Sequence, residues 1–460
     1  MIFSFKSDPF KQLKREIGKA KVMTDPASIS VYGMDATIGR GSAICVTFPE
    51  NTDDVISIVK FASERLIPIT PRGSGSGLSG GSIPSNGSIV MSFERMRQIL
   101  SFEPEKHLSI VQPGVITADF QNEVIKYGLF YPPDPSSHTV STIGGNVAEN
   151  AGGLRCFKYG VTSQYVLGIE FVNPDGEIQK TGILSNSIYE PDLTYVMVGS
   201  EGTLGIFTKI ALRLIPLPEY TYTLCGYYSS PSTALGIMDE LVGTGVLPSV
   251  MEFMDDVSLN AVSKYIEHTI PVGSEALLLL ELDGKRTEVE EQIPIVKSLL
   301  EKESLNIETA DLKIHRDKLW NLRRNISPSL STMSSGKVHE DISVPRGSLK
   351  KMVKKVQDIR TTSGLNIAVY GHCGDGNLHI VVMFDSNSSE QVKKAKQTAE
   401  SIMRNALALG GSISGEHGVG LTKNAYINWQ LSEEVLSLMK QTKKTLDPEN
   451  IFNPEKIFPK

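Results

Sequence analysis

The stretch PRGSGSGLSGG, residues 71–81, decides the first half of the fold. It holds five glycines in eleven residues and directly follows a short predicted strand, residues 66–70. Glycine accepts positive φ angles and lets several backbone N–H groups converge on one anion. We therefore predict a loop that cradles a phosphate group, with a mobile linker as the alternative for this composition.

Residues 75–80 of this loop, GSGLSG, match the dinucleotide fingerprint GxGxxG. In a Rossmann fold that fingerprint must open a helix. Here the chain continues through Ser82, Ile83 and Pro84 into a second predicted strand, residues 88–93. The match is therefore interpreted as a phosphate loop of another kind.

Two further glycine-rich loops follow in the chain. The segment PPDPSSHTVSTIGGNVAENAGG, residues 132–153, combines prolines, small hydroxyl residues and two Gly-Gly pairs. The segment VGSEGTLGIFT, residues 198–208, again places glycines beside small polar residues. One such loop is weak evidence, but three in succession predict a large phosphate-containing cofactor.

Length and composition restrict the class of protein to which this chain can belong. The 460 residues exceed one ordinary core, so two or more domains are expected. A net charge of -6 argues against a nucleic-acid partner. The most apolar run, residues 276–280, is far shorter than the roughly 20 residues of a membrane-spanning helix. The charged N-terminus predicts no secretory signal, and four scattered cysteines predict neither an iron–sulfur centre nor a disulfide framework.

These features predict a cytoplasmic protein of the α+β class. Pro216 and Pro218 close a strand-rich first half and mark a boundary, after which longer helices alternate with strands. We expect a cofactor domain at residues 1–217, a cap or substrate domain at residues 218–425, and a C-terminal segment, residues 426–460, that returns to the first domain.

Two histidine motifs lie in the second half: GHCGDGNLH, residues 371–379, and SGEHGVG, residues 414–420. His372 and His379 are seven residues apart, which on one straight strand would send them to opposite faces. The intervening glycines allow a tight reversal that would bring both imidazoles together. With Glu416 they form a ligand set suited to zinc, iron or manganese with open positions. The alternative is two ordinary strand histidines and an exposed acid.

The adjacent His417 is the candidate general base. Removing hydride from the α-carbon of a 2-hydroxy acid requires its hydroxyl to lose a proton, which a bound metal makes easier. A neutral histidine has a suitable pKa for taking that proton. The reverse assignment, with His417 as ligand and Glu416 as base, stays open. A metal hydrolase would use similar ligands but would leave the glycine loops unexplained.

On these loops the chain, over roughly residues 36–216, resembles the FAD-binding domain of vanillyl-alcohol oxidase type flavoenzymes, a two-subdomain fold. The resemblance implies that residues 72–79 wrap the pyrophosphate. The first loop lacks the histidine that relatives with covalent flavin often carry, so non-covalent FAD is expected. The residues implied to contact FAD are Pro71, Arg72, Gly73, Ser74, Gly75, Ser76, Gly77, Leu78, Ser79, Pro135, Ser141, Thr142, Gly144, Gly145, Asn146, Gly152, Gly153, Gly202, Ile206 and Asn453.

The two histidine motifs extend the resemblance to FAD-linked oxidases of the D-lactate dehydrogenase, glycolate oxidase and D-2-hydroxyglutarate dehydrogenase group. It implies a metal held by His372, His379 and Glu416, with His417 as base. It also implies an arginine for the substrate carboxylate, which falls on Arg323 in LWNLRRN, residues 319–325.

The resemblance further implies a metal-assisted dehydrogenase, with D-lactate or glycolate as the first expectation and D-2-hydroxyglutarate as the alternative. Electrons would leave to a quinone, an electron-transfer flavoprotein or an iron–sulfur subunit, through which the protein would reach a membrane. A homodimer is left open. The rival is a non-catalytic flavin subunit that relays electrons.

Two details stay open in this comparison with the family. Glu455 stands where the family usually has glycine, which puts the contacts of the tail in doubt. Lys337 and His339 compete as the second anchor of the substrate carboxylate.

Overall fold

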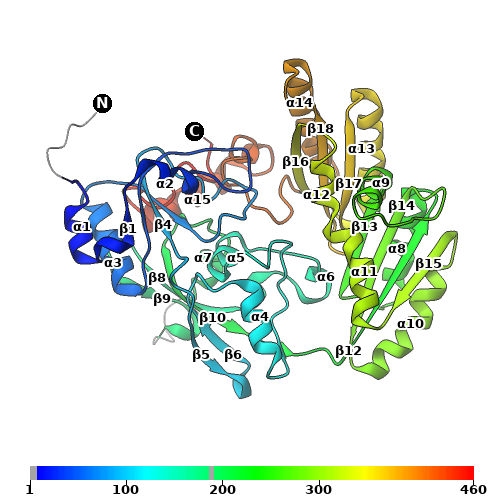
Figure 1. Cartoon of the computed structure of the whole chain (residues 1–460), viewed down its shortest axis with the longest axis horizontal. Coiled ribbons are helices and arrows are strands. Elements are labelled where there is room, and N and C mark those ends of the chain that lie inside the picture. Colours follow the sequence, from blue (N-terminus) through cyan, green and yellow to red (C-terminus); the bar gives the residue numbers. More distant parts are fainter. Residues whose placement is uncertain (1–7, 186–190, 460) are drawn as a thin grey trace. The chain divides into compact units, whose positions relative to one another are not determined.

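The computed structural model describes residues 8–185 and 191–459. The chain forms two compact units (Figure 1). The first consists of Met1–Ala151, Val161–Leu217 and His417–Lys460, and the second of Gly152–Gly160 and Pro218–Glu416. The short segment 152–160, including α6 (Cys156–Tyr159), thus packs in the second unit although its sequence continues a glycine loop of the first.

The first sheet of the first unit has the strand order β1-β2-β4-β3. Strands β2 and β3 each pair with β4 in parallel. The first glycine loop connects β3 directly to β4 and opens no helix, which confirms that GSGLSG is not a Rossmann fingerprint. The elements are α1 (Lys11–Glu16), β1 (Val22–Met23), α2 (Pro26–Ser30), β2 (Ala43–Thr47), α3 (Thr52–Ser63), β3 (Ile69–Arg72) and β4 (Ser88–Ser92).

The second sheet of this unit is antiparallel, with the order β5-β6-β10-β8-β9. Strands β8 and β9 form a hairpin around Asn173-Pro174-Asp175-Gly176, a sequence typical of a turn. The elements are β5 (Ile99–Glu103), β6 (Leu108–Val111), α4 (Thr117–Ile125), β7 (Leu129–Phe130), α5 (Ile143–Glu149), β8 (Val166–Val172), β9 (Ile178–Lys180), α7 (Thr194–Met197), β10 (Ile206–Arg213), β11 (Ile215–Pro216) and α15 (Glu433–Leu446).

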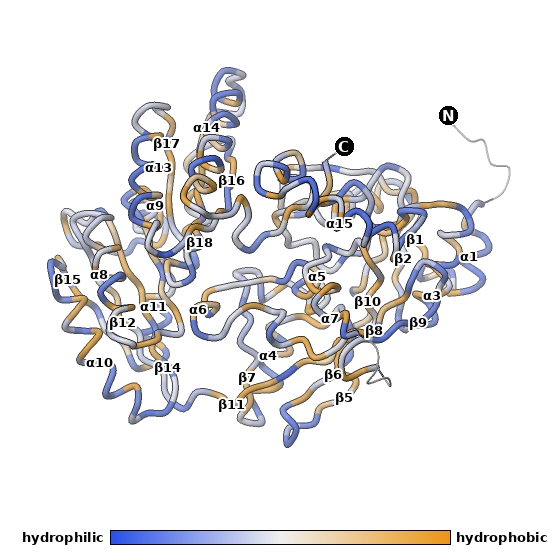
Figure 2. The backbone as a smooth tube through the Cα atoms, turned by 180° about the vertical axis from the view of Figure 1, so that it is seen from behind, coloured by the Kyte–Doolittle hydropathy of each residue, from blue (hydrophilic) through white to orange (hydrophobic). Residues whose placement is uncertain are grey.

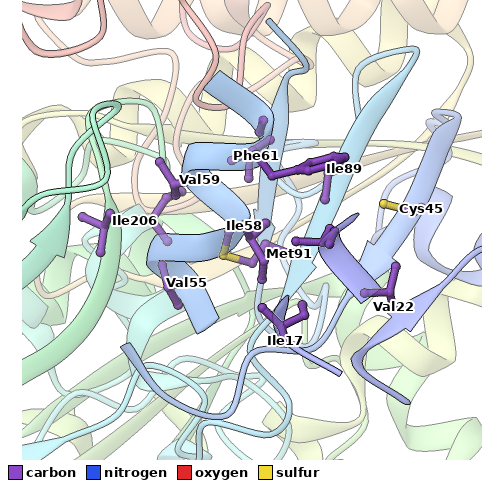
Figure 3. Close-up of a cluster of buried hydrophobic side chains, with 14 of the residues drawn as sticks. Ile17, Val22, Cys45, Val55, Ile58, Val59, Phe61, Ile89, Met91 and Ile206 are labelled. Carbon is purple, nitrogen blue, oxygen red and sulfur yellow. The ribbon is translucent and has the colours of Figure 1, made fainter. Parts of the chain in front are cut away.

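A shared apolar core joins these elements (Figure 3). Helix α3 contributes Val55, Ile58 and Val59, which are fully buried among Ile89 and Met91 of β4. Ile206 of β10 and Phe452 of the C-terminal segment belong to the same cluster. The tail returns to the first sheet, where Ile69 N–H donates to the Ile451 carbonyl over 2.7 Å.

The second unit is built on a seven-stranded antiparallel sheet of order β15-β12-β14-β13-β17-β18-β16. Both faces of β14 are buried, since Leu277 and Leu278 are each at most 1% exposed and point to opposite faces. The strands are β12 (Tyr220–Tyr228), β13 (Val250–Asp255), β14 (Ala276–Gly284), β15 (Ser304–Ala310), β16 (Gly336–Ser343), β17 (Asn366–His372) and β18 (Asn377–Phe384).

Two groups of helices cover this sheet. One group packs on the face that carries Cys225 and Leu279, and consists of α9 (Asp256–Tyr265), α11 (Lys313–Arg324) and α12 (Ile326–Ser331). The members of the other group contact one another and are α8 (Pro231–Gly243), α10 (Arg286–Leu300), α13 (Leu349–Ser363) and α14 (Ser389–Ala408). The sheet is therefore the middle of three layers, which accounts for its apolar strands.

Helix boundaries follow the capping signals. Asn51 accepts the Asp54 N–H and begins α3, and Ser432 accepts the Val435 N–H and begins α15, and both residue types are typical of this position. Helix α3 ends at Ser63, although Leu66 continues its apolar spacing, because the φ of 52° at Leu66 is incompatible with a right-handed helix. Figure 2 shows α13 and α14 as largely hydrophilic with recurring apolar positions, the pattern of helices with one buried side. Within the described residues no helix has the length and apolarity needed to span a bilayer.

Candidate active site

Both histidines of the first motif lie on the hairpin of β17 and β18. Strand β17 ends at His372 and β18 begins at Asn377, so the glycine-rich turn reverses the chain between them. The two rings meet edge to face with centroids 5.2 Å apart, and their Nε2 atoms are separated by 3.4 Å. The turn thus brings the two imidazoles to one point, as their spacing required.

Glu416 joins the two histidines from a loop. Its Oε1 atom lies 3.4 Å from Nε2 of both His372 and His379. The loop is fixed by the buried Asp341 of β16, whose Oδ2 atom accepts the backbone N–H groups of Gly415 and Glu416 over 2.9 Å each. Asp341 therefore sets the backbone that carries the third member of the cluster.

The three atoms form a triangle with sides of 3.4 Å. Ligand atoms bound to a tetrahedral divalent ion at roughly 2.0–2.2 Å lie about 3.3–3.6 Å apart. Two imidazole nitrogens and one carboxylate oxygen are also a donor set typical of zinc, iron and manganese. The residues present therefore fit a divalent metal, and Asp341 has a carboxylate oxygen within 4.8 Å of ligand atoms of His379 and Glu416.

Glu252 on β13 supports the cluster from behind. Its Oε1 atom lies 2.5 Å from Nδ1 of His372, and its Oε2 atom accepts the Nε–H group of Arg323. A carboxylate behind a metal-binding histidine fixes the tautomer and aims the other nitrogen at the metal. The same buried carboxylate thus orients a candidate ligand and the candidate substrate arginine.

Arg323 lies on α11 with its side chain only 7% exposed. Its guanidinium carbon is 4.9 Å from the centre of the Tyr370 ring, and its buried Nη2 atom has no hydrogen-bond partner among the described residues. The neighbouring Arg324 is 53% exposed and pairs with Asp317, as expected for a solvated side chain. Arg323 therefore keeps one buried donor available for a ligand.

Electrostatics in the cluster are strong. Burial lowers the pKa of His372, but the carboxylates of Glu252 and Glu416 outweigh it and hold that pKa well above its ordinary value. Burial likewise raises the pKa of Glu416, but His372 and His379 outweigh it and hold the pKa well below the usual range. The carboxylate of Glu416 is therefore ionised and able to bind a cation.

The two candidates for a second carboxylate anchor differ in position. His339 stacks beside Tyr370, and its ring centroid is 5.5 Å from that of His379. The exposed Lys337 instead donates to the Ser331 hydroxyl over 2.6 Å. Of the two, His339 is the residue beside the cluster.

In the first unit, the first two glycine loops pack against each other. The Ser74 hydroxyl donates to the Val140 carbonyl over 2.5 Å, and Gly73 faces the Thr142 hydroxyl so closely that a Cβ atom would collide with it. Gly75 has a φ of 73° and lies against the guanidinium of Arg72. Arg72 itself donates to the Met34 carbonyl, so it braces the loop from one side.

The backbone of this loop suits an anion. Across the part of the chain that the structure describes, the N–H groups of residues 74–78 have no protein acceptor. A Cβ atom added at Gly77 would meet no atom within 4 Å, so there is open space beside the loop. Backbone N–H groups without a protein acceptor, beside open space, suit the binding of a pyrophosphate.

The other predicted FAD residues fall into three groups. Most line the loops of the first unit: Ser79, Pro135, Ser141, Thr142, Gly144, Gly145, Asn146, Gly202 and Ile206. Asn453 donates to the carbonyls of Gly81 and Glu201, which links the tail to the first and third loops. Gly152 and Gly153 belong to the second unit, where a Cβ atom at Gly152 would lie 2.8 Å from Glu416.

Two supporting acids, Glu252 and Asp341, were not found by sequence reasoning. Glu252 interrupts the apolar run of β13, VMEFMD, and a charged residue inside such a strand needs a buried partner. That signal was present in the sequence. For Asp341, in the mixed strand GKVHEDIS, the sequence held no comparable signal.

Comparison with known families gives two matches that together span most of the chain. Residues 43–182 match the model "FAD binding domain", and residues 217–457 match "FAD linked oxidases, C-terminal domain". The glycine loops lie in the first match, except for the third loop, and the histidine motifs lie in the second.

Two curated relatives are similar over nearly their whole length. Glycolate oxidase subunit GlcD of Bacillus subtilis (strain 168) is 39% identical over 98% of this chain and 97% of its own. D-lactate dehydrogenase of Anaerostipes hadrus is 33% identical over 92% of this chain and 91% of its own.

Solved structures share the fold at low sequence identity. p-Cresol methylhydroxylase with substrate bound has a TM-score of 0.81 at 17% identity, covering 97% of this chain and 95% of that one. Alkyldihydroxyacetonephosphate synthase has a TM-score of 0.77 at 18% identity, covering 99% and 86%. These likenesses confirm the predicted vanillyl-alcohol oxidase type fold.

Proposed function

The chain belongs to the FAD-linked oxidase family, and from this premise we propose that it oxidises D-lactate or glycolate to the 2-oxo acid. As a member of that family it is an FAD-dependent oxidoreductase acting on a CH–OH group. The names of its relatives, glycolate oxidase subunit and D-lactate dehydrogenase, support a small 2-hydroxy acid as substrate.

The observation that carries the proposal is the triangle of His372, His379 and Glu416 in the same unit as a buried arginine. The triangle supports a divalent metal, which is zinc, iron or manganese by ligand type. Arg323 has a buried Nη2 donor without a protein partner, and Glu252 holds both Arg323 and His372. Such an arrangement is suited to a substrate that carries a carboxylate beside a hydroxyl.

Each residue then has one task. Arg323 binds the substrate carboxylate with charge-assisted hydrogen bonds, and Tyr370 packs against its guanidinium. His372, His379 and Glu416 hold the metal. His417, the residue after Glu416, takes the proton of the substrate hydroxyl, and the loops of the first unit hold non-covalent FAD.

When bound, FAD supplies the acceptor for the hydride released from the α-carbon, and the divalent ion makes the neighbouring hydroxyl more acidic. The electrons pass on to a separate acceptor, which we propose is a quinone, an electron-transfer flavoprotein or an iron–sulfur subunit.

The test is anaerobic bleaching of the bound flavin by a panel of substrates. D-lactate or glycolate should bleach it fastest, L-lactate should be much slower, and lactate esters should fail because Arg323 requires a free carboxylate. D-2-hydroxyglutarate belongs in the panel as the alternative substrate. No bleaching by any 2-hydroxy acid, with FAD and metal both measured as present, would overturn the proposal in favour of an electron-relay subunit.

His417→Asn gives the corresponding test of the base. Flavin reduction should slow by roughly 10²–10⁴-fold, the usual contribution of a positioned base, while metal content is retained. Loss of the metal instead would assign His417 as the ligand and Glu416 as the base.

A further inference from the structure

The segment that follows His417 is held by a buried glutamate of the third glycine loop. Oε1 of Glu201 accepts the Val419 N–H over 2.8 Å, and Oε2 accepts the Gly420 N–H over 2.7 Å. Glu201 is 6% exposed. One carboxylate thus accepts two successive backbone N–H groups, which fixes both the position and the direction of the chain at this point.

Glu201 is itself locked in place. Its φ of 51° lies in the left-handed region, which costs a non-glycine residue about 1–2 kcal/mol. Its N–H donates to the Ala148 carbonyl over 2.8 Å, and its carbonyl accepts the Asn453 side chain over 2.8 Å. Strain that is maintained by this many contacts is usually found where a side chain must be aimed at a functional site.

A second carboxyl group faces the same segment. Glu149, at the end of α5, lies so close to Gly418 that a Cβ atom there would collide with its Oε2 atom. The same Cβ atom would lie 2.9 Å from Oε1 of Glu201. Gly418 has a φ of 86°, so glycine is required both by the backbone and by the two carboxyl groups.

The surroundings of the two carboxyl groups differ. Burial and the neighbouring Glu201 raise the pKa of Glu149 well above its ordinary value. Burial also raises the pKa of Glu201, and the N–H groups of Val419 and Gly420, together with Lys456, oppose part of this rise.

We propose that Glu201 is a positioning residue for His417, acting through the backbone of Val419 and Gly420. The inference rests on the proposed function, because it requires His417 to act as the base. The same segment is anchored on its far side, where the Leu421 N–H donates to the Ser79 carbonyl over 2.8 Å. The segment that follows His417 is therefore held by the first and third glycine loops together.

The experiment uses the FAD-loaded protein and the variant Glu201→Gln. Glutamine has the same shape but presents an NH₂ group to one of the two N–H donors, so one bond becomes a repulsion. The limiting rate of flavin reduction should fall by roughly 10- to 100-fold, the usual effect of a small displacement of a reacting group. The substrate Kd should be little changed, because Glu201 touches no residue assigned to substrate binding.

A double-mutant cycle separates positioning from a general structural defect. In a His417→Ala background the same Glu201→Gln change should have almost no further effect on the rate, since the residue being positioned is gone. An equal loss in both backgrounds would overturn the proposal. The matched control is Glu170→Gln. Glu170 is another buried glutamate of the first unit and is bonded to Thr208 and Lys209. The flavin of this variant should be reduced at the wild-type rate.

Hydrogen exchange gives a readout that does not depend on turnover. Amide exchange in residues 417–421 should accelerate in Glu201→Gln and stay unchanged in Glu170→Gln. Unchanged exchange in Glu201→Gln would show that Glu201 does not hold the segment, whatever the substrate proves to be. If instead no 2-hydroxy acid reduces the wild-type flavin, the proposed function fails. Accelerated exchange would then still support the role of Glu201 in holding Val419 and Gly420.

Discussion

In the second unit the ligand cluster is built from side chains, two of them on paired strands, whereas in the first unit the cofactor loops are built mainly from backbone. His372, His379 and Asp341 lie on three neighbouring strands of one sheet, in the register Asp341 opposite His379. The first glycine loop instead presents the N–H groups of residues 74–78, and its side chains serve to brace it.

The difference lies in how each region compensates charge. In the cluster, Glu252 and Arg323 are buried together and each compensates the other, so removal of one leaves an uncompensated charge. In the first glycine loop the donors are backbone N–H groups, which carry only partial charge and can bind an anion. Side-chain truncation should therefore be most damaging in the second unit, and loss of glycine most damaging in the first.

The largest effect is expected at Arg323. Arg323→Ala removes the group that donates hydrogen bonds to the substrate carboxylate and leaves Glu252 without this cationic partner. The loss in kcat/KM should therefore correspond to about 2–5 kcal/mol of transition-state stabilisation. Stopped-flow flavin reduction over a range of substrate concentrations measures the loss. Arg324→Ala, one residue on but 53% exposed, is the matched control and should behave as wild type. Equal losses in both variants would contradict the assignment of the carboxylate site.

The next effect is expected at Glu252. Glu252→Gln keeps the shape but removes the charge behind His372, so metal affinity should fall by roughly 10–100-fold, as for other residues behind metal ligands. Competition with a chelator followed by metal analysis measures this directly. Glu281→Gln, on the neighbouring strand and bonded to Trp320 and Thr223, is the control with similar burial. If both variants lose metal equally, burial in this sheet rather than the contact with His372 is the cause.

Much of the fold was predictable because its signals are local. Asn51 and Ser432 cap their helices, and the turn after Val172 closes the hairpin of β8 and β9. The strand after the first glycine loop excluded a Rossmann fold. What could not be predicted depends on tertiary contacts, such as the packing of Lys158 against Asp283, 125 residues away, which ties a piece of a glycine loop to the second unit.

The site shows the same division. The spacing of His372 and His379 and the glycines between them predicted a shared point, because a tight turn is a local property. The roles of Asp341 and Glu201 depend on partners 75 and 218 residues away, and one sequence carries no record of such pairings. The candidate ligands are therefore predictable from the sequence, whereas the residues that hold them are not.

A glycine substitution tests the first unit. Gly75→Ala places a Cβ atom at a φ of 73° and against the guanidinium of Arg72, so FAD affinity should fall, with a strain of about 1–2 kcal/mol. Gly128→Ala has a similar φ of 69° with nothing within 4 Å of the added atom. Gly128→Ala should lower the free energy of unfolding by a similar amount without changing FAD affinity. Fluorescence titration of FAD into the apoprotein separates the two, and equal FAD affinities would contradict the predicted cradle.

The smallest effect at neutral pH is expected at Glu149, and it concerns the protonation of this carboxyl group. Its pKa in the folded protein is raised by burial and by Glu201, with Asp35 adding to the effect and the Ser79 hydroxyl opposing it. A raised folded pKa means that the folded state binds the proton more tightly than the unfolded state. The resulting stability is fully present below pH 4.5, the ordinary pKa of a glutamate, and is lost as pH rises through the folded pKa.

Glu149→Gln should remove this dependence, because a carboxamide resembles the protonated acid and does not titrate. Thermal unfolding of the FAD-loaded proteins should therefore show the variant gaining Tm relative to wild type as pH rises above about 4.5, the ordinary pKa of a glutamate. The control is Glu170→Gln, which removes a carboxylate paired with Lys209 and should lose Tm relative to wild type instead. Parallel Tm curves for wild type and Glu149→Gln across this range would contradict the raised pKa of Glu149.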